Sequence, residues 1–420
     1  MEPERLPIVV IGAGGAGLIA AWKSASVGAP VLLLERNRKA AIKLLISGGG
    51  KCNVTHEGPM EELRAAFPSR QGRFLKHAFF AFTNADIRSL LARRGVDTRA
   101  RENGRVFPQS GRASDVVDAL VSLARSAGAD IQLDSKVESV FCGNGLMHVA
   151  FKGRTILTHQ LIVATGGASY RKTGTTGDGF TWAAALGHTI TPISPALAPI
   201  RTNPPLPKDW RGIALRNGRL DVYCQGKKLA HDRGDILFTH EGISGPAALA
   251  LSRTAASALL HGETVLRYDF FPDLDFRALD AKLNTMVLAA RGRMLTTLLE
   301  EYLPNRMIAQ MLDSIRVATD SRGYTLRREE RKAIVQMLKS WSIGAVEHVE
   351  LDRGEVTSGG VSLDEVDPRT MESRKVRGLH LAGEVLDIDG PIGGYNLQAA
   401  FSTGFVAGES AANSYMESAH

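Results

Sequence analysis

Short aliphatic runs at both ends of the chain have the pattern of strands buried on both faces. Residues 7–11 (PIVVI) and 31–34 (VLLL) flank a helical stretch, and residues 161–163 repeat the buried pattern. Residues 378–384 form another strand-like run, which ends on a glycine and an acid ahead of a small-residue helix over 399–411. Strands that alternate with helices are typical of a parallel sheet covered by helices. We therefore predict an α/β fold.

The middle of the chain follows a different pattern. Prolines 192, 195, 199, 204, 205 and 207 mark an exit from the alternation of strands and helices. Short β-like runs at 220–224, 235–239 and 264–271 favour a small antiparallel sheet or barrel. From 274 to 341 the apolar period becomes helical, and the methionines there are interpreted as core residues rather than as ligands. The three helical stripes are Leu279, Leu283, Met286 and Val287; Met307, Ile308, Met311, Leu312 and Ile315; and Ile334, Met337, Leu338 and Trp341.

These patterns predict one discontinuous domain with insertions. The domain covers residues 1–194 and 353–420. A β-rich insertion covers 195–272 and 342–352, and a helical insertion covers 273–341. A chain of 420 residues has room for two or three such compact units.

Composition and charge narrow the function classes. The hydrophobic fraction of 44% is that of a globular protein, and the longest uncharged stretch, 179–200, holds His188 and three prolines, so it is a poor membrane helix. The net charge of +7 is spread along the chain, and the densest cluster, 327–332, mixes both signs. We interpret that cluster as a solvated helix face and regard nucleic acid as a less favoured partner.

The cysteines and histidines indicate neither a thiol redox pair nor a metal site. Cys52, Cys142 and Cys224 lie far apart, so we predict no disulfide scaffold and a reducing, cytoplasmic setting. The eleven histidines form no zinc-binding spacing, and no G-x-S-x-G motif marks a hydrolase. We expect no metal and no membrane anchor.

A glycine-rich loop over residues 12–17 (GAGGAG) lies between the first strand and its helix. Gly12 permits the tight turn, Gly14 lets the backbone approach a pyrophosphate, and Gly17 lets the helix pack on the strand. The helix N-terminus favours phosphate there. Glu35, which ends the second strand, is placed to accept hydrogen bonds from the adenosine ribose. This unit predicts a dinucleotide without distinguishing FAD from NAD.

Three further segments favour FAD. Residues 42–53 contain three consecutive glycines flanked by Ser47 and Asn53, which offer a backbone-rich surface to a flat ring or to phosphates, while Cys52 is interpreted as a small structural residue. The strand at 161–163 runs into a glycine turn on the far side of the sheet. Near the C-terminus, Glu384 follows a strand and is expected to hold ribityl hydroxyls. The helix start at 394–396 is expected to point amides at the flavin edge, where reduction places negative charge. A domain that binds only NAD does not need a segment near the C-terminus to contact the cofactor.

Together these residues resemble the YhiN-like (BaiN-like) bacterial flavoproteins, which are NAD(P)/FAD-dependent oxidoreductases. The family often has arginine where this chain has Lys51, and asparagine where it has His56. The resemblance implies a Rossmann-like FAD domain of the glutathione-reductase type, interrupted by β-barrel-like and helical insertions. The stretches that carry the resemblance are 12–17, 43–53, 234–252, 356–361 and 378–408.

We therefore predict an FAD-dependent oxidoreductase that acts on a small organic substrate. Only one glycine fingerprint is present, so NAD(P)H is expected to bind transiently if it reduces the flavin. Alternatives are an oxidase or dehydrogenase of an amine or unsaturated substrate that uses no nicotinamide, and a flavin-binding RNA-associated protein. His240, in the segment FTHEGISGP, is a candidate proton donor, although this segment also fits a simple helix cap. The predicted FAD contacts are Gly12, Gly14, Ala16, Gly17, Glu35, Arg36, Lys43, Ser47, Gly48, Gly49, Asn53, Val137, Thr165, Gly166, Gly383, Glu384, Gly394, Asn396 and Leu397.

Overall fold

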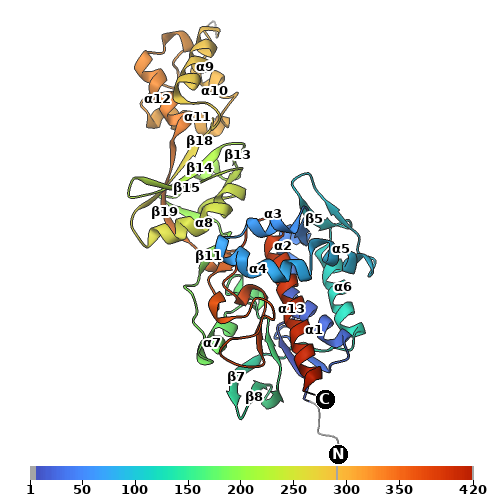
Figure 1. Cartoon of the computed structure of the whole chain (residues 1–420). Coiled ribbons are helices and arrows are strands. Elements are labelled where there is room, and N and C mark those ends of the chain that lie inside the picture. Colours follow the sequence, from blue (N-terminus) through green and yellow to red (C-terminus); the bar gives the residue numbers. More distant parts are fainter. Residues whose placement is uncertain (1–5, 290–291, 419–420) are drawn as a thin grey trace, which may run out of the picture. The chain divides into compact units, whose positions relative to one another are not determined.

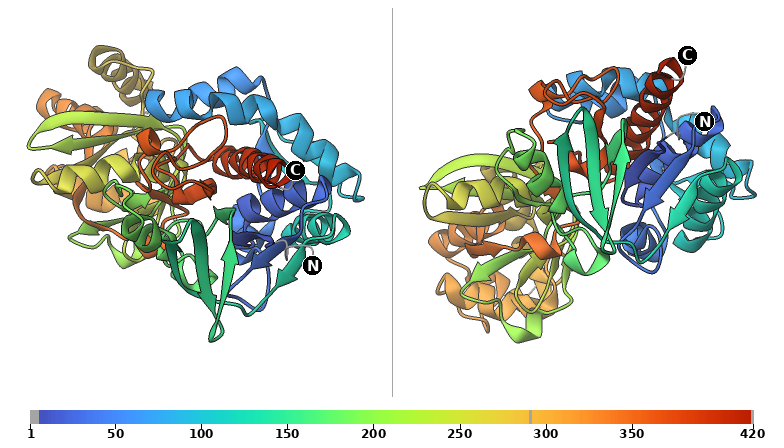
Figure 2. Two further views of the ribbon diagram at one scale, coloured as in Figure 1. Left: turned by 60° about the horizontal axis from the view of Figure 1, so that its bottom comes forward. Right: turned by 90° about the horizontal axis from the view of Figure 1, so that it is seen from below.

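The computed structural model describes residues 6–289 and 292–418, and the chain divides into two compact units. Unit 1 comprises Met1–Ser194 and Gly354–His420, and unit 2 comprises Pro195–Arg353. Unit 1 is therefore built from both ends of the chain, and unit 2 is inserted between its two parts. In Figures 1 and 2, unit 1 takes the blue-to-green and red ends of the colour scale, and unit 2 takes most of the middle.

A five-stranded parallel sheet forms the centre of unit 1. Its strands are β21 (Leu379–Leu381), β10 (Leu161–Val163), β1 (Ile8–Ile11), β2 (Val31–Leu34) and β6 (Asp130–Gln132), in that order across the sheet. Every residue of β1, β2, β10 and β21 is buried, because helices and loops cover both faces. The prediction of an α/β fold with a parallel sheet is confirmed.

The helices of unit 1 include α1, which follows β1, and the C-terminal helix α13. All of them are α1 (Gly15–Ser26), α2 (Ile42–Gly50), α3 (Met60–Ala65), α4 (Ser69–Ala81), α5 (Asn84–Ala92), α6 (Ala113–Ser126), α7 (Asp178–Ala185) and α13 (Tyr395–Glu417). The predicted small-residue helix over 399–411 is thus longer at both ends. α13 (red) lies beside α1 (blue) in Figure 1, and small residues bring the two backbones together. A Cβ at Gly404 would overlap Ala16, and one at Gly408 would overlap Ala20.

A Gly404→Val variant should destabilise the chain by at least about 3 kcal/mol, since the new side chain meets backbone that cannot rotate away. Urea unfolding followed by circular dichroism measures the loss. Asn413→Val places the same side chain on an exposed position of the same helix and should leave the unfolding midpoint nearly unchanged. Equal midpoints for the two variants would contradict the close α1–α13 contact.

His380 is a fully buried titratable side chain at the middle of β21. Its Nδ1 lies 3.1 Å from the Thr370 carbonyl oxygen and its Nε2 lies 3.0 Å from Gln160 Oε1. Burial lowers the pKa of His380, against the opposing hydrogen bond to Thr370 and the charge of Glu372. The folded chain therefore keeps this ring neutral at pH values where the unfolded chain binds a proton.

The free energy of unfolding should consequently fall as the pH falls below about 6.5, the ordinary pKa of histidine, by up to about 1.4 kcal/mol per pH unit from this group. Urea unfolding at a series of pH values from about 7 to about 5 measures the slope. A His380→Gln variant should show a shallower slope than the wild type. An unchanged slope would mean that His380 takes up its proton equally easily in both states.

Two small antiparallel sheets complete unit 1. One contains β3 (Thr55–His56), β5 (Arg105–Pro108) and β4 (Thr98–Ala100), and the other contains β7 (Val137–Gly143), β8 (Leu146–Phe151) and β9 (Arg154–Thr158). The β7–β9 sheet is the green ribbon at the centre of the right-hand view in Figure 2. The remaining short elements of unit 1 are β20 (Val356–Ser358), η1 (Arg171–Thr173), η5 (Leu363–Glu365) and η6 (Gly383–Val385), and β11 (Ser194–Ala196) begins at the last residue of its first segment.

Unit 2 contains an eight-stranded antiparallel sheet, with β13 at one end and β15 at the other. In order across the sheet the strands are β13 (Ala214–Leu215), β16 (Ile236–Phe238), β17 (Gly242–Ser244), β12 (Ile200–Asn203), β19 (Trp341–Val349), β18 (Thr264–Asp269), β14 (Arg219–Cys224) and β15 (Lys227–Arg233). The β-like runs identified in the sequence correspond to β14, β16 and β18.

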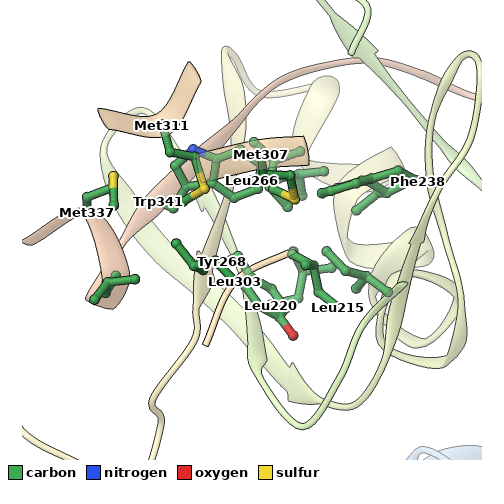
Figure 3. Close-up of a cluster of buried hydrophobic side chains, with 14 of the residues drawn as sticks. Leu215, Leu220, Phe238, Leu266, Tyr268, Leu303, Met307, Met311, Met337 and Trp341 are labelled. Atoms are coloured by element: carbon green, nitrogen blue, oxygen red, sulfur yellow. The ribbon is translucent and has the colours of Figure 1, made fainter. Parts of the chain in front are cut away.

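The helices of unit 2 share a hydrophobic core with this sheet. They are α8 (Pro246–Leu259), α9 (Phe276–Ala289), α10 (Leu295–Leu299), α11 (Asn305–Ser314) and α12 (Arg328–Lys339), with η2 (Lys208–Trp210), η3 (Gly323–Thr325) and η4 (Leu351–Arg353). Figure 3 shows Met307, Met311 and Met337 gathered with Trp341 and strand residues such as Leu266. The methionines are therefore core residues, as interpreted from the sequence.

One residue of the predicted helical stripes lies elsewhere. Trp341 begins β19, because α12 ends at Lys339 and the chain enters the sheet after Ser340. The indole still packs in the same core, where its ring lies 5.5 Å from that of Trp210. Apolar periodicity identified the burial of Trp341 correctly but assigned it to the wrong element.

Lys339 ties the end of α12 to the sheet of unit 2. Its Nζ donates to Asp269 Oδ2 at 2.8 Å and to the carbonyl oxygens of Phe271 and Leu274 at 2.7 and 2.6 Å. The ammonium group is nearly buried, and these three acceptors compensate its lost hydration.

Within residues 6–289 and 292–418, no helix has the length and apolar character needed to cross a bilayer. In the same described part of the chain, His, Cys, Asp and Glu side chains form no group of three or more that could hold a metal ion.

Candidate functional site

The glycine loop between β1 and α1 contains glycines with different physical roles. Gly12 has a φ of +101°, and a Cβ there would lie 2.5 Å from the Ala164 carbonyl oxygen. A Cβ at Gly17 would overlap the Gly12 carbonyl oxygen. Gly14 has a φ of −80°, and a Cβ there would meet no atom within 4 Å. Gly12 and Gly17 are therefore required by packing, whereas nothing in the fold itself requires glycine at Gly14.

The N-terminus of α1 is suited to an anion. No side chain caps it, and its first turn contains no acidic residue. Amides of the first helical turn, which have no acceptor within the helix, and the helix dipole favour a negative group at this position. Open space at Gly14, beside these amides, is what a pyrophosphate would need.

Glu35 lies immediately after β2 and is almost fully buried. Its Oε2 accepts a hydrogen bond from the Ala13 amide at 2.8 Å, and its Oε1 accepts one from the Asn37 amide at 2.9 Å. Burial raises the pKa of Glu35, against these hydrogen bonds, which lower it. Oε1 also accepts Asn37 Nδ2 at 2.8 Å, so both of its lone pairs are used. Oε2 keeps one lone pair, with which the carboxylate can hold the loop and still accept a ribose hydroxyl.

Arg36 and Val137, two other predicted contacts, lie near this end of the sheet. Arg36 donates to Asp178 Oδ2 at 3.0 Å and to Thr176 Oγ1, which ties the end of β2 to the segment before α7. Val137 is buried at the start of β7. The structure gives Arg36 an intramolecular partner, so a ligand contact from its guanidinium stays a prediction.

Lys43 and Glu384 form an ion pair although they are far apart in sequence. Lys43 Nζ lies 2.8 Å from Glu384 Oε2 and donates to Ser169 Oγ at 2.9 Å. Glu384 Oε1 accepts the Thr357 amide at 2.8 Å. About one fifth of each charged side chain remains exposed, 21% for Lys43 and 20% for Glu384, so both can still contact a ligand.

The segment 47–53 makes a kinked end of α2. Ser47, Gly48 and Gly49 have non-helical dihedral angles, and a Cβ at Gly49 would meet no atom within 4 Å. Cys52 is fully buried, and burial raises the pKa of its thiol to about 12. This agrees with the interpretation of Cys52 as structural, because a thiolate is disfavoured there at neutral pH.

Two predicted contact residues carry buried oxygen atoms without a partner. Within the described residues, neither Asn53 Oδ1 nor Thr165 Oγ1 has a hydrogen-bond partner. Such atoms are rare in proteins, and both lie in segments that were singled out as ligand contacts. Gly166, the next residue, has a φ of +74° and begins the turn after β10.

The C-terminal contacts lie against the N-terminal ones. A Cβ at Gly383 would lie 2.9 Å from that of Ala16, so the start of η6 lies beside the start of α1. Gly394 precedes α13 with a φ of +98°, where a Cβ would overlap the Thr55 backbone, and no side chain caps this helix. Asn396 holds the loop before α13, since its Oδ1 accepts the Gly390 amide at 2.8 Å. Leu397 is half-buried in the first turn.

These residues of unit 1 fit a dinucleotide such as FAD. Two uncapped helix N-termini, open space at Gly14 and Gly49, and two unpartnered oxygens occur among residues from both ends of the chain. Lys43 and Glu384 add two charged groups, each of which can replace a contact of their ion pair with a contact to a ligand. Which of these residues contact FAD stays a prediction.

His240 belongs to unit 2, in the turn of the β16–β17 hairpin. Its side chain is 59% exposed, and its Nε2 lies 3.6 Å from Glu241 Oε1. The turn is held by Thr239, whose amide donates to the Gly242 carbonyl oxygen at 2.8 Å and whose Oγ1 accepts the Gly242 amide at 3.1 Å. The backbone that carries His240 is therefore well ordered by local hydrogen bonds.

A pocket with a volume of about 350 Å³ opens at this turn. We call it the arginine pocket; its charged and hydroxyl-bearing lining includes Arg201, Arg211, Thr239, His240, Glu241 and Arg353. Partial burial raises the pKa of Glu241, but the hydrogen bond and charge of Arg353 outweigh it, so the pKa is lowered and the carboxylate is ionised at neutral pH. All lining residues lie in unit 2.

Sequence reasoning singled out His240 and missed the arginines beside it. Arg201, Arg211 and Arg353 come from three separated segments, and no motif spacing connects them. Only pairing of those segments in the sheet reveals the cluster: Arg201 is opposite Gly242 in β12 and β17, and the Gly212 amide donates to the Phe238 carbonyl oxygen.

Comparisons with known proteins support the resemblance found in the sequence. A family model described as "HI0933-like protein Rossmann domain" matches residues 6–410. A ribosomal RNA dihydrouridine synthase from Escherichia coli K12 is 30% identical over 97% of this chain and 98% of its own length. A 3-dehydro-bile acid delta(4,6)-reductase from Clostridium scindens is 29% identical over 96% of this chain and 98% of its own length.

A likeness among solved structures concerns the fold alone. The 3-ketosteroid delta1-dehydrogenase of Sterolibacterium denitrificans, solved with 1,4-androstadiene-3,17-dione, matches with a TM-score of 0.53 and 14% identity. The match covers 97% of this chain and 99% of that protein. The whole chain, including the inserted unit, thus follows an architecture that occurs elsewhere.

Proposed function

This chain belongs to the HI0933-like Rossmann-domain family and is an FAD-dependent oxidoreductase, and we propose that it reduces a carbon–carbon double bond conjugated to a carbonyl group, with uridine in RNA as substrate. We also propose the finer fold predicted from the sequence, a glutathione-reductase-type FAD domain with β-rich and helical insertions.

The dinucleotide cradle of unit 1 is the observation that carries the proposal. The N-terminus of α1 and the open space at Gly14 would hold the pyrophosphate, and Glu35 would hold the adenosine ribose. Asn53 and Thr165 would give their unpartnered oxygens to the cofactor. When bound, FAD supplies two-electron hydride chemistry.

Other side chains of unit 1 would tune the site. Lys43 holds Glu384 in place, and this ion pair would leave one acceptor face toward the ribityl hydroxyls. The uncapped N-terminus of α13 would stabilise negative charge that develops on reduction. The chain's own contribution is then to orient the bound cofactor, to exclude water from it and to stabilise the negative charge of its reduced form.

The names of the two relatives describe the same kind of chemical change. Dihydrouridine differs from uridine by two hydrogens across a ring double bond next to a carbonyl, and a delta(4,6)-reductase of a 3-dehydro compound removes unsaturation that can be conjugated to a ketone. In the proposed reaction the alkene gains a hydride on one carbon and a proton on the other. NAD(P)H loses the hydride and becomes NAD(P)⁺, so atoms and electrons balance.

The substrate proposal favours RNA over a steroid. The arginine pocket of unit 2 is lined by three guanidinium groups and by the carboxylates of Glu241 and Glu350, so its formal charge stays positive. These charges suit a phosphate and would be costly to cover with an apolar steroid skeleton. The net charge of +7 also favours a polyanion. The sequence by itself favoured a small organic substrate; the ribosomal RNA relative and the pocket shift the proposal toward a nucleotide.

His240 is proposed as the proton donor to the substrate. It is a pocket-lining imidazole, which can both donate and accept a proton, and the Thr239 turn holds its backbone. Glu241 and Arg353 would fix its surroundings through their own ion pair.

Two measurements on purified, FAD-loaded enzyme test the proposal. Anaerobic stopped-flow mixing with NADH or NADPH should bleach the flavin absorbance, and reoxidation should follow when unmodified ribosomal RNA is added. Mass spectrometry of the digested RNA should then show a nucleoside heavier by two hydrogens. Bleaching by neither nicotinamide would exclude the reductant, and rapid oxygen consumption with an amine would favour the oxidase alternative. Reoxidation by a 3-oxo-4-ene steroid but not by RNA would move the substrate to the steroid class.

A further inference from the structure

The arginine pocket has a built geometry that comes from three paired segments. The turn at 239–242 lies between the segment of Arg201 and that of Arg211. On one side the Thr202 amide donates to the Glu241 carbonyl oxygen at 3.1 Å, and on the other the Gly212 amide donates to the Phe238 carbonyl oxygen at 3.0 Å. Backbone hydrogen bonds thus place the segment of Arg201 on one side of the turn that carries His240 and the segment of Arg211 on the other.

The guanidinium groups of this pocket differ in how fully they are compensated. Arg353 is paired with Glu241, and its Nε also lies 3.1 Å from Glu350 Oε2. Arg201 Nε lies 3.6 Å from Glu347 Oε2, close enough for an ion pair, but within the described residues it has no hydrogen-bond partner. Within the described residues, the side chain of Arg211 has no hydrogen bond or ion pair. Arg211 is therefore the cation that is available to an incoming anion.

The lining of the pocket indicates what kind of anion it takes. A volume of about 350 Å³ is in the lower range of small-ligand sites and has room for one nucleotide. Hydroxyl groups of Thr239 and Ser244 and the apolar surface of Leu237 line the same space as Arg211. A planar guanidinium can bind two phosphate oxygens at once, while the apolar patch can cover a base or sugar.

We propose that the arginine pocket binds a phosphodiester of the RNA substrate, with Arg211 as the residue that contacts the phosphate. This inference rests on the proposed function and deepens it by placing a nucleotide subsite within unit 2. Arg353, held by Glu241 and Glu350, and Arg201, which lies beside Glu347, position the walls, and His240 lines the same pocket.

Binding of RNA to oxidised, FAD-loaded enzyme without any reductant tests the proposal. The probe is a fluorescein-labelled RNA oligonucleotide, followed by fluorescence anisotropy at several salt concentrations. Arg211→Gln should weaken binding about tenfold at low salt and reduce the salt slope by about one. Arg216→Gln removes the same charge from an exposed position of the same unit that does not line the pocket, and it should leave binding nearly unchanged.

The outcomes separate this site from the reaction itself. Flavin content and circular dichroism of both variants should equal those of the wild type, since neither position lies in unit 1. Equal losses in the two variants, or no loss in Arg211→Gln, would overturn the phosphate site, as would a wild-type enzyme that does not bind RNA. Cholate, a steroid carboxylate, is the second probe. If Arg211→Gln lost cholate binding but kept RNA binding, the assignment would also be overturned. An RNA that binds through Arg211 but is never reduced would leave the site intact and refute the proposed function.

Discussion

A Gly14→Val variant should fold as the wild-type chain does and fail to retain FAD. The valine side chain has room, because a Cβ at Gly14 meets no atom within 4 Å and the φ of −80° suits any residue. The cost to the free energy of unfolding should be at most about 1 kcal/mol, the usual size of a change at a helix N-cap. The same side chain would occupy the space that a pyrophosphate needs beside the α1 amides, so FAD affinity should fall by at least about a thousandfold.

Flavin absorbance after gel filtration, with urea unfolding of the apoprotein, measures both effects. Gly17→Val is the contrasting variant, since a Cβ there overlaps the Gly12 carbonyl oxygen, and it should lose the fold together with the flavin. A Gly14→Val protein that carries flavin at wild-type stoichiometry would refute the placement of the pyrophosphate. One that unfolds like Gly17→Val would show that Gly14 serves packing instead.

A His240→Asn variant should bind RNA normally and reduce it about a hundred- to ten-thousandfold more slowly, the usual range for loss of a general acid. Asparagine keeps a polar side chain of similar size on a turn held by Thr239, so the local backbone should not change. Single-turnover formation of dihydrouridine measures the effect.

His231→Asn is the matched control, because His231 is also an exposed histidine of unit 2 and does not line the pocket. Its kcat should equal that of the wild type. Flavin reduction by NAD(P)H should stay normal in both variants, which separates proton transfer to the substrate from the reductive step. An unchanged kcat in His240→Asn would remove His240 from the mechanism and leave the general acid to be sought elsewhere.

Local sequence patterns predicted the elements of the parallel sheet well, because those strands are buried on both faces. The runs at 7–11, 31–34 and 161–163 correspond to β1, β2 and β10 within a residue. Element ends were less predictable. α13 begins at Tyr395, within the helix start predicted at 394–396, whereas the small-residue pattern by itself placed only 399–411 in the helix, because Gly394 against the Thr55 backbone sets the start. Trp341 was assigned to a helix because burial looks alike in both kinds of element.

In the candidate site, too, local features were predictable from the sequence and long-range contacts were not. Strand, glycine loop, helix and terminal acid are local features, and they marked Gly12, Gly14, Gly17 and Glu35 directly. The ion pair between Lys43 and Glu384 joins positions more than three hundred residues apart, and no spacing rule predicts it. A long-range pair of this kind depends on which loops the parallel sheet brings to one edge.

The sequence by itself determined the chemistry of the cofactor end: a dinucleotide loop at the N-terminus, a second approach near the C-terminus, and an oxidoreductase family that uses both. It also assigned Gly14 to the ligand and Gly17 to packing, but a one-letter pattern does not contain the distance from an absent side chain to its neighbours. The tertiary structure supplied that distance: a side chain at Gly14 would face open space, and one at Gly17 would face backbone. Only the pairing of strands in unit 2 gathered Arg201, Arg211 and Arg353 around His240, since proximity across a sheet is set by register and not by order along the chain.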